Sequence, residues 1–552
     1  MRIHFRYLLV WMVVSCLMFA TTTEAQVVWE SPQKEIYPYL ERMAQKGLIQ
    51  FNDLIRPLSR QYIASCLDSL GRRMDQLTPV EKKEWQFYAR EYGNEMDTSL
   101  FRSGKDFVSG FRKDPYQRWR PFTARSKESL IQAEPIFTAE QNNGSRGRFL
   151  QSSSGVNVWA YGGKRWGFQF SYHDITEAGT GLDSTRQFTP NTGFVLKQTN
   201  NPRRINYSRI RGSVSYAFKN GSVAVGIDQQ LWGYSQSGRI VLSDKAPANP
   251  YLRLDYRPFS WLSFHYSNLW LNSNLVDSVR TYGTGNTVYG GERIRYIPKF
   301  MATHSISIQF NKHLTFTAGE SIVYSDRLDV GYLIPVNFFK IYDNIVNGGN
   351  ILAGSNGQLF FQLSSRNQLP NTHLYSTLFI DEIRTSTMFN RNKSRNQLGF
   401  TFGASVTDLV IPYLTLSAEY TRVNPFVYNN LIPAQNYNNH GYSMGDWMGN
   451  NFDRFFVGLR YTPLPRLKCQ LNYQFIRKGG AGTVEQQYFQ QPQPDFLFNP
   501  QFNRREVSLR CSYELINNLQ LWGFFNDRKQ EALPSGTFTN IREAGIGFSF
   551  GL

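Results

Sequence analysis

Residues 209–233 constrain the fold more than any other stretch, because their pattern predicts a β-hairpin with two chemically different faces. Apolar side chains such as Ile210 alternate with polar ones such as Arg211, and successive side chains of a strand point to opposite faces. Asn220-Gly221 supplies the positive φ angles of a tight hairpin turn. The polar face carries full charges, so it must face either bulk water, as in a soluble sandwich, or the lumen of a membrane barrel.

The connections between strand-like segments decide between these architectures. From residue 133 onward, eight short reversals alternate with nine long connections, which predicts eighteen strands. Outer-membrane barrels have short periplasmic turns, long outer loops and an even number of strands, and both ends of this segment lie on the short-turn side. The short reversals fall at 163–165, 219–221, 258–261, 311–313, 368–373, 407–412, 463–466 and 516–519, and the long connections at 141–154, 175–207, 233–250, 272–299, 325–355, 385–395, 424–451, 478–504 and 529–541.

Other segments show the same alternation of polar and apolar side chains. Arg253 and Asp255 oppose Leu254, and Glu419 opposes Tyr420. An arginine that faced lipid at mid-depth would cost roughly 2–4 kcal/mol, so we expect these charges to face the lumen. The fold class predicted is therefore mainly β, an 18-stranded antiparallel transmembrane β-barrel.

The N-terminal quarter differs from the rest. Residues 1–25 have the basic start and apolar run of a secretory signal peptide. Residues 26–100 are predicted to form a small periplasmic domain of three amphipathic helices, the third with a capping box of Thr78 and Glu81. We expect residues 101–132 to be an irregular basic connector and residues 133–552 to form the barrel, with both chain ends in the periplasm of a Gram-negative bacterium.

The net charge of the chain limits which partners it can bind. The formal net charge of +18 favours anionic partners such as lipopolysaccharide or an acidic glycan, and export argues against nucleic acid. A mean hydropathy of −0.42 suits a barrel, because only alternate strand residues face lipid.

Cys469 and Cys511 each alternate in phase with the apolar residues of their strands. They are interpreted either as small lipid-facing residues or as a cross-strand disulfide.

Short motifs that are weak singly occur in order along the chain. They are Tyr39-Leu40, Gly47-Leu48-Ile49, Arg56-Pro57-Leu58-Ser59-Arg60, Gly226-Ile227-Asp228, Trp232-Gly233, His304-Ser305-Ile306-Ser307, Gly319-Glu320-Ser321, Ile380-Asp381-Glu382 and Glu419-Tyr420-Thr421. Together they resemble the Wzi-type capsule assembly proteins of Gram-negative outer membranes. The resemblance implies an eighteen-stranded barrel with a periplasmic helical bundle, acting as a lectin that holds capsular polysaccharide at the cell surface.

Two positions depart from the family pattern. Tyr234-Ser235 follows Trp232-Gly233 where a turn richer in Pro and Gly is expected, and Ser305 stands where a basic residue is common. Both departures leave the predicted fold unchanged, and they leave the identity of the glycan open.

A glycan site needs aromatic faces for the C–H surfaces of sugars, and planar amide or guanidinium groups for hydroxyls and carboxylates. The long loops and the charged lumen face carry such groups. The structural alternatives are solvated loop residues, a self-neutralising charge ladder in the lumen and, for Trp232, an aromatic residue at the membrane interface. The candidates are Arg209, Arg211, Asp228, Trp232, Arg253, Asp255, Arg257, Glu419, Tyr428, Asn436, Tyr437, Tyr442 and Trp447.

Catalysis is not expected. His265 and Ser267 share a strand face, but no third residue that would orient them is identifiable. No phosphate-binding loop or metal-ligand cluster appears, so no cofactor is predicted. The predicted function is binding of capsular or other surface polysaccharide and its retention or assembly at the cell surface. Two alternatives stay open: a porin-like channel, and a structural component of an envelope complex that docks another protein through the helices.

Overall fold

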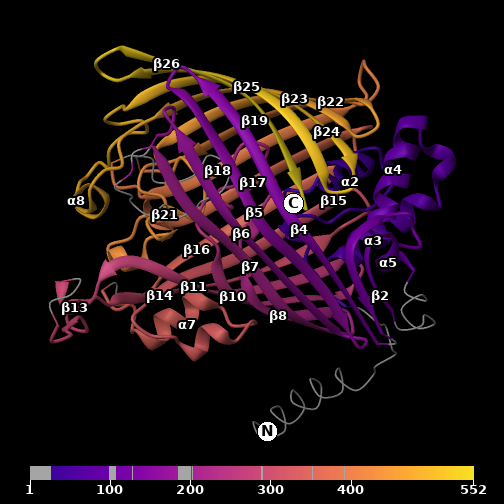
Figure 1. Ribbon diagram of the computed structural model, residues 1–552. Helices are drawn as coiled ribbons and strands as arrows, with labels where there is room; N and C mark the ends of the chain where they lie inside the picture. Colours follow the sequence, from indigo (N-terminus) through magenta and orange to yellow (C-terminus); the bar gives the residue numbers. More distant parts are fainter. Residues whose placement is uncertain are drawn as a thin grey trace, which may run out of the picture.

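The computed structural model describes residues 26–97, 107–126, 128–183, 201, 203–286, 290–350, 352–390 and 392–551. Its centre is a closed barrel of eighteen antiparallel strands, which confirms the predicted fold class (Figure 1). The predicted signal peptide lies outside the described residues. The barrel strands are β4 (Ser129–Gly144), β5 (Gly147–Gly162), β6 (Trp166–Gly179), β7 (Arg204–Phe218), β8 (Gly221–Asp228), β10 (Asn249–Phe259), β11 (Leu262–Val276), β14 (Tyr296–Gln309), β15 (Leu314–Ser325), β16 (Asn356–Arg366), β17 (Thr372–Ile383), β18 (Asn396–Thr407), β19 (Leu414–Val423), β22 (Phe452–Leu464), β23 (Leu467–Lys478), β24 (Phe502–Ile516), β25 (Leu519–Ala532) and β26 (Thr537–Phe550).

Each barrel strand pairs with the next one along the chain, and β26 pairs with β4 to close the ring. The closing register runs from Phe550 opposite Phe137 to Glu543 opposite Gly144. All eight predicted short reversals connect strands of the barrel. These eight reversals therefore lie at one end of the barrel, the short-turn end, and the other connections lie at the opposite end, the long-loop end.

Two of the connections predicted to be long are tight turns. β4 and β5 pair as far as Gly144 and Gly147, and β25 and β26 as far as Ala532 and Thr537. The prediction was wrong here because polar residues on both faces of these strand ends hid the alternation. The backbone hydrogen bonds nevertheless continue the ladder, since pairing does not require an apolar face.

The segment predicted as an irregular connector contains a β-hairpin. β2 (Phe107–Lys113) pairs with β3 (Trp119–Arg125), and β3 pairs with the first residues of β4. The barrel therefore begins at Ser129 rather than at residue 133. The basic residues that suggested an irregular chain have specific partners, because Arg118 and Arg120 both form ion pairs with Glu91 of the helical domain.

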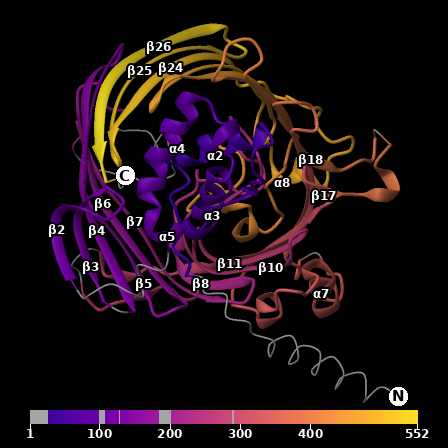
Figure 2. The same cartoon turned by 90° about the vertical axis from the view of Figure 1, so that its right-hand side faces the viewer.

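The helical domain contains the three predicted helices and a short fourth one. They are α2 (Ile36–Gln45), α3 (Arg60–Gly71), α4 (Pro79–Glu91) and α5 (Gly93–Met96), with η1 (Met74–Gln76) before α4. Thr78 and Glu81 form the predicted capping box. Figure 2 shows these helices inside the ring of strands. They occupy its short-turn end, where Arg42 donates to Asp408 at 2.7 Å. Among the described residues, no helix combines the length and hydrophobicity needed to cross a membrane.

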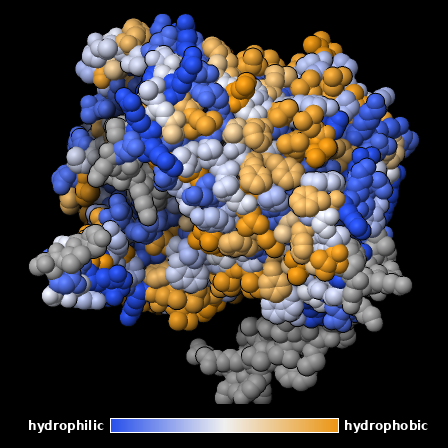
Figure 3. All heavy atoms as spheres, in the orientation of Figure 1, coloured by the Kyte–Doolittle hydropathy of each residue, from blue (hydrophilic) through white to orange (hydrophobic). Residues whose placement is uncertain are grey.

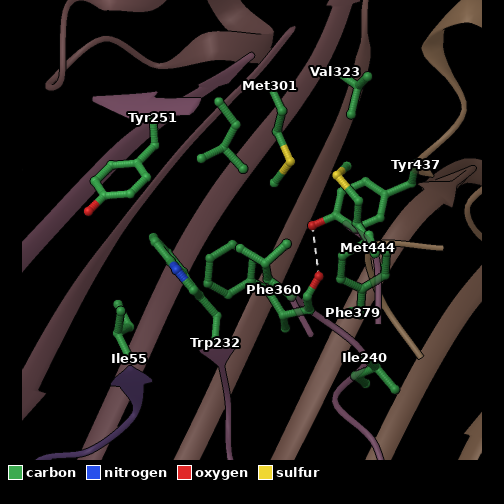
Figure 4. Close-up of a cluster of buried hydrophobic side chains, with 14 of the residues drawn as sticks. Ile55, Trp232, Ile240, Tyr251, Met301, Val323, Phe360, Phe379, Tyr437 and Met444 are labelled. Carbon is green, nitrogen blue, oxygen red and sulfur yellow. Dashed lines mark hydrogen bonds between the residues drawn. The ribbon is translucent and has the colours of Figure 1, made fainter. Parts of the chain in front are cut away.

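Two of the long connections fold inward and fill the lumen beyond the helices. They are residues 229–248 and 424–451, which we call the loop plug. Trp232 and Tyr437 of the loop plug pack against lumen-facing residues of the wall such as Phe360 and Phe379 (Figure 4). The plug and the helical domain meet in a two-stranded sheet of β1 (Ile55–Arg56) and β9 (Leu231–Trp232).

The outer wall carries the lipid-facing band that the parity predicts. In β16, Leu359 is 44% exposed, whereas its neighbours Gln358 and Phe360 are buried toward the lumen. Figure 3 shows hydrophobic residues over much of the wall and hydrophilic residues toward its ends. On this face Cys469 of β23 and Cys511 of β24 form a disulfide. Of the two interpretations of these cysteines, the structure contains the bridge.

The loops at the long-loop end contain further short elements. They are β12 (Tyr282–Gly283), β13 (Glu292–Arg293), η3 (Val330–Leu333), α7 (Phe339–Val346), η4 (Thr385–Thr387), η5 (Pro433–Gln435), β20 (Asn438–Asn439), β21 (Tyr442–Ser443) and α8 (Val484–Tyr488).

Candidate functional site

Most of the charged candidates on the lumen face are paired within the protein. Arg211 donates to both carboxylate oxygens of Asp228, at 2.6 and 2.7 Å. Arg253 donates to Asp255 and to the carbonyl oxygen of Pro57 in the helical domain. Because these guanidinium groups are engaged within the protein, they match the self-neutralising charge ladder more closely than a free basic surface for an acidic polymer.

The other lumen candidates lie apart from one another. Arg209 contacts the segment before α2, and Arg257 donates to the carbonyl oxygen of Ser260 in a short turn at 2.6 Å. Glu419 accepts hydrogen bonds from the Ser235 hydroxyl and the Gln236 backbone, both at 2.8 Å. Glu419 therefore fixes the loop plug to the wall.

Three aromatic candidates are buried in the loop plug. Trp232 is 1% exposed and lies edge-on to Phe360, with ring centroids 5.9 Å apart. Both interpretations of Trp232, a sugar platform and a residue of the membrane interface, require an exposed ring, so this part of the prediction was wrong. The hydroxyls of Tyr428 and Tyr437 each donate at 2.7 Å to backbone carbonyls of residues 240–241.

The remaining candidates are partly exposed members of the same plug. The backbone carbonyl of Asn436 accepts from Lys299 at 2.5 Å, and Trp447 Nε1 donates to the carbonyl of Ser237 at 3.0 Å. Tyr442 packs against the apolar cluster of the plug. The thirteen candidates therefore do not converge on one open site.

An open cavity of about 320 Å³ lies among the loops at the long-loop end. Its walls come from the loop around α7, the ends of β16 to β18, residues 429–431 of the loop plug, and α8. Amides dominate the lining: Asn344, Asn347, Asn350, Asn356, Gln397, Asn429 and Asn430. A volume of a few hundred Å³ is typical of a small-ligand site. A cavity of about 430 Å³ also lies between the helical domain and the short-turn end of the wall, so it is the position among the long loops and the amide lining that make the first cavity the candidate.

Asp343 organises the wall of this cavity that α7 provides. Its carboxylate accepts hydrogen bonds from the side chains of Tyr332 at 3.0 Å and Asn347 at 2.9 Å. The backbone of Ser355 and the ammonium of Lys340 donate to the same carboxylate, each at 2.9 Å. Four donors satisfy this buried carboxylate, and the loop is thereby held in one shape.

Asp381 and Glu382 form the floor at the end of β17. Asp381 accepts from the Gln358 side chain at 3.1 Å and from the backbone N–H of Tyr428 at 2.7 Å. Glu382 accepts from the Gln397 amide at 3.2 Å. The floor is therefore fixed both to the barrel wall and to the loop plug.

Tyr488 of α8 is the aromatic residue in the lining. Its hydroxyl accepts from the backbone of Leu431 at 3.2 Å. The guanidinium of Arg395 stands 5.4 Å from its ring centroid. Burial raises the pKa of Tyr488 above its ordinary value, so the hydroxyl stays protonated and able to donate at neutral pH.

This lining suits a polyhydroxylated ligand. Amides and carboxylates bind hydroxyl groups in both directions, and a tyrosine ring offers a face to sugar C–H groups. Lys340 is its one cationic side chain among three carboxylates, Asp343, Asp381 and Glu382. The cavity therefore favours neutral or amino sugars over strongly acidic ones. Within the described residues, no cluster of three or more His, Cys, Asp or Glu side chains could hold a metal ion.

The sequence located the loops of this cavity better than its residues. Asn429 and Asn430 belong to the long connection that the prediction emphasised. It missed Lys340, Asp343 and Tyr488. A signal was present around α7, where Asn344, Asn347 and Asn350 recur at helical spacing beside apolar residues.

Comparisons with known proteins support the fold. Neither a scan of protein-family models nor a search of curated proteins finds a match. Among solved structures, the chain is similar to Wzi of Escherichia coli, described as an outer-membrane, carbohydrate-binding β-barrel involved in group 1 capsule assembly. The TM-score is 0.57 at 10% identity, over 96% of this chain and 100% of Wzi. OprD of Pseudomonas aeruginosa gives 0.43 at 11% identity, over 81% and 98% of the chains. The fold is thus that of an outer-membrane barrel like Wzi.

Proposed function

We propose that this protein binds surface polysaccharide through its long-loop end and helps to retain or assemble it at the cell surface. The observation that carries the proposal is the amide-rich cavity of about 320 Å³ on a barrel whose lumen is crossed by the loop plug. The fold shared with a carbohydrate-binding barrel supports it. In this proposal the short turns, the helical domain and both chain ends face the periplasm, and the loops face outward.

The cellular test is deletion of the gene. Surface polysaccharide is then measured in the cell-bound fraction and in the medium, with total synthesis as the control. Release into the medium at unchanged synthesis is the expected result, because a binding protein of this kind retains a polymer made elsewhere. An unchanged division between cells and medium would contradict the proposal.

A variant locates the site. Asn430→Ala together with Tyr488→Phe removes one lining amide and one lining hydroxyl. We expect binding of purified polysaccharide to the detergent-solubilised protein to weaken about tenfold, because each lost hydrogen bond to a ligand is worth about 0.5–1.5 kcal/mol. The matched control is Asn201→Ala, an exposed asparagine outside the cavity. Equal weakening by both variants would show that the cavity is not the site.

The channel alternative is tested in planar bilayers. The loop plug and the helical domain meet inside the lumen through Ile55 and Trp232, so we expect no steady current from the intact protein. Steady ohmic current would favour the porin-like function. The docking alternative predicts instead that an envelope protein co-purifies with the full chain and is lost when exposed residues of the helical domain are changed.

The proposal includes no catalytic step. His265 Nδ1 lies 2.5 Å from Asp255, and the Ser267 hydroxyl donates to Gln230 at 3.0 Å. The hydrogen bonds of these two side chains thus go to different partners, which supports this part of the proposal. An assay for polysaccharide cleavage with the purified protein tests this expectation.

A further inference from the structure

One patch of the outer wall of the barrel carries polar side chains where lipid would be expected. Glu320 on β15 and His304 on β14 lie opposite each other and share the outward parity of Ile306, which is 46% exposed. On the next strand Glu320 lies opposite Leu359 of the lipid-facing band. A carboxylate at this depth is unfavourable in hydrocarbon, so this patch requires a cover.

The loop between β15 and β16 supplies that cover. The backbone N–H groups of Phe339 and Lys340, at the start of α7, donate to Glu320 at 2.9 and 2.7 Å. His304 Nδ1 lies 2.9 Å from the carbonyl oxygen of Pro335. A carboxylate that accepts from the first N–H groups of a helix is stabilised by both the hydrogen bonds and the helix dipole. Figure 2 shows α7 outside the ring of strands.

The aromatic residues around this patch complete the contact. Phe339 is fully buried between the cover and the wall, and the Tyr266 hydroxyl on β11 donates to the carbonyl of Tyr332 at 2.9 Å. Tyr324 and Tyr332 have ring centroids 4.5 Å apart. The cover is therefore attached to the wall by both polar and apolar contacts.

The outer edge of the cover is strongly apolar. Val336, Phe338, Ile341 and Ile345 are between 59% and 75% exposed. Phe338, Ile341 and Ile345 recur at helical spacing, so they form one edge of the helix. In Figure 3, hydrophobic atoms extend over α7 at the lower edge of the visible face. An exposed apolar edge of this size requires an apolar partner.

The opposite edge of α7 lines the candidate glycan cavity. Lys340, Asp343, Asn344 and Asn347 follow one another at spacings of three, one and three residues and all belong to the lining. The same short helix thus separates two environments. Its polar edge faces the cavity and its apolar edge faces away from the barrel.

We propose that outer-leaflet lipid covers the apolar edge of α7, so that α7 lies in the membrane plane and forms the membrane-side wall of the glycan cavity. Lipid is the occupant that continuity favours, because the edge extends the band marked by Leu359 and Ile306 at the same level of the wall. Glu320 and His304 then never meet hydrocarbon. The lipid contact stands on these residues alone and does not depend on the proposed function.

The test measures lipid contact in the full-length protein. A bimane fluorophore is attached at Ile345→Cys, in a Cys66→Ser background, and the protein is placed in phosphatidylcholine nanodiscs with brominated acyl chains. Leu359→Cys reports the barrel's lipid band and Asn344→Cys reports the polar edge of the same helix. We expect the Ile345 label to be quenched as strongly as the Leu359 label, and the Asn344 label to be much less quenched.

Equal weak quenching at Ile345 and Asn344 would overturn the proposal. If quenching at Ile345 appears only after detergent removes a co-purified protein, the occupant is a protein and the proposal also fails. A second variant, Glu320→Ala, tests the attachment of α7 to the wall. It should reduce the difference in quenching between the Ile345 and Asn344 labels. Heat-modifiable migration in gels is the control for barrel folding. An unchanged difference would show that Glu320 does not hold α7 at the lipid surface.

Discussion

The helical domain and the loop plug fill the same lumen, yet different chemistry holds them there. In the helical domain, Arg60 donates to the carboxylates of Glu30, Glu91 and Glu95 at 2.6, 3.1 and 2.7 Å. Arg366 of the wall reaches Asp53 at 2.6 Å. Buried ion pairs therefore hold this domain together and also attach it to the wall.

The loop plug is held mainly by aromatic packing and by hydrogen bonds in which at least one partner is neutral. Tyr428 and Tyr437 donate to backbone carbonyls of the facing loop, and Phe379 packs against both rings at centroid distances of 5.4 and 5.5 Å. Charged groups also contact the plug, but mostly through neutral partners: Glu419 accepts from Ser235 and Gln236. A buried ion pair joins Arg454 and Asp446. Buried ion pairs depend on both charged partners, so the helical domain and the loop plug should respond differently to mutation and to acid.

The largest effect is expected at Arg60. Arg60→Met leaves the carboxylates of Glu30, Glu91 and Glu95 without their shared cation, which should cost the helical domain about 3–5 kcal/mol. Cys66 is the one free cysteine among the described residues and is buried in this domain. Its labelling by a maleimide should accelerate roughly 10²- to 10⁴-fold at neutral pH.

The control is Arg72→Ala, which removes an exposed ion pair with Asp68. A surface pair contributes at most about 1 kcal/mol, so labelling of Cys66 should change little. If both variants accelerate the labelling of Cys66 equally, the buried ion pairs of Arg60 stabilise the domain no more than the exposed pair of Arg72 does.

Acid should loosen the helical domain before the loop plug. Arg42 and Lys46, each 2.6 Å from Glu81, outweigh burial and lower the pKa of Glu81 from 4.5 to about 2. Because the folded-state pKa is the lower one, this stabilisation is present above pH 4.5 and is lost as the pH falls toward 2. The shift corresponds to about 3 kcal/mol.

The measurement is pepsin cleavage within residues 26–97 between pH 5 and 2, for the wild type and for Glu81→Gln. The wild type should resist cleavage better near pH 5, and the difference should vanish toward pH 2. A difference that does not change with pH would exclude Glu81 titration as its cause.

The same contrast explains what the sequence could predict. Alternation along strands and Thr78 with Glu81 in a capping box are local patterns, so the barrel and the helices were predictable. The loop plug depends on contacts across distant segments, such as Tyr437 with residue 241. Its loops look solvated in sequence because their Asn, Gly and Tyr residues satisfy one another only after folding.

One signal of the plug was nevertheless present in the strands. Apolar residues interrupt the polar lumen face at matching positions of neighbouring strands: Leu269 lies opposite Met301, which lies opposite Val323, and Phe360 lies opposite Phe379. A water-filled lumen would not favour such a ring. The glycan cavity gave a weaker signal, since its amides come from several loops whose relative positions only the fold defines.

The smallest effect is expected in the loop plug, when the hydroxyl of Tyr437 is removed. Tyr437→Phe leaves the carbonyl oxygen of Val241 buried without its donor, which should cost about 1–3 kcal/mol. In planar bilayers, transient openings should become roughly ten- to a hundredfold more frequent.

Burial raises the pKa of Tyr437, so its hydroxyl is neutral throughout the acid range and the effect should be the same at pH 7 and pH 4. The control, Tyr282→Phe, changes a tyrosine that is 55% exposed in another loop and should leave the openings unchanged. Openings that increase with acid in the wild type would mean that the plug, like the helical domain, depends on charge.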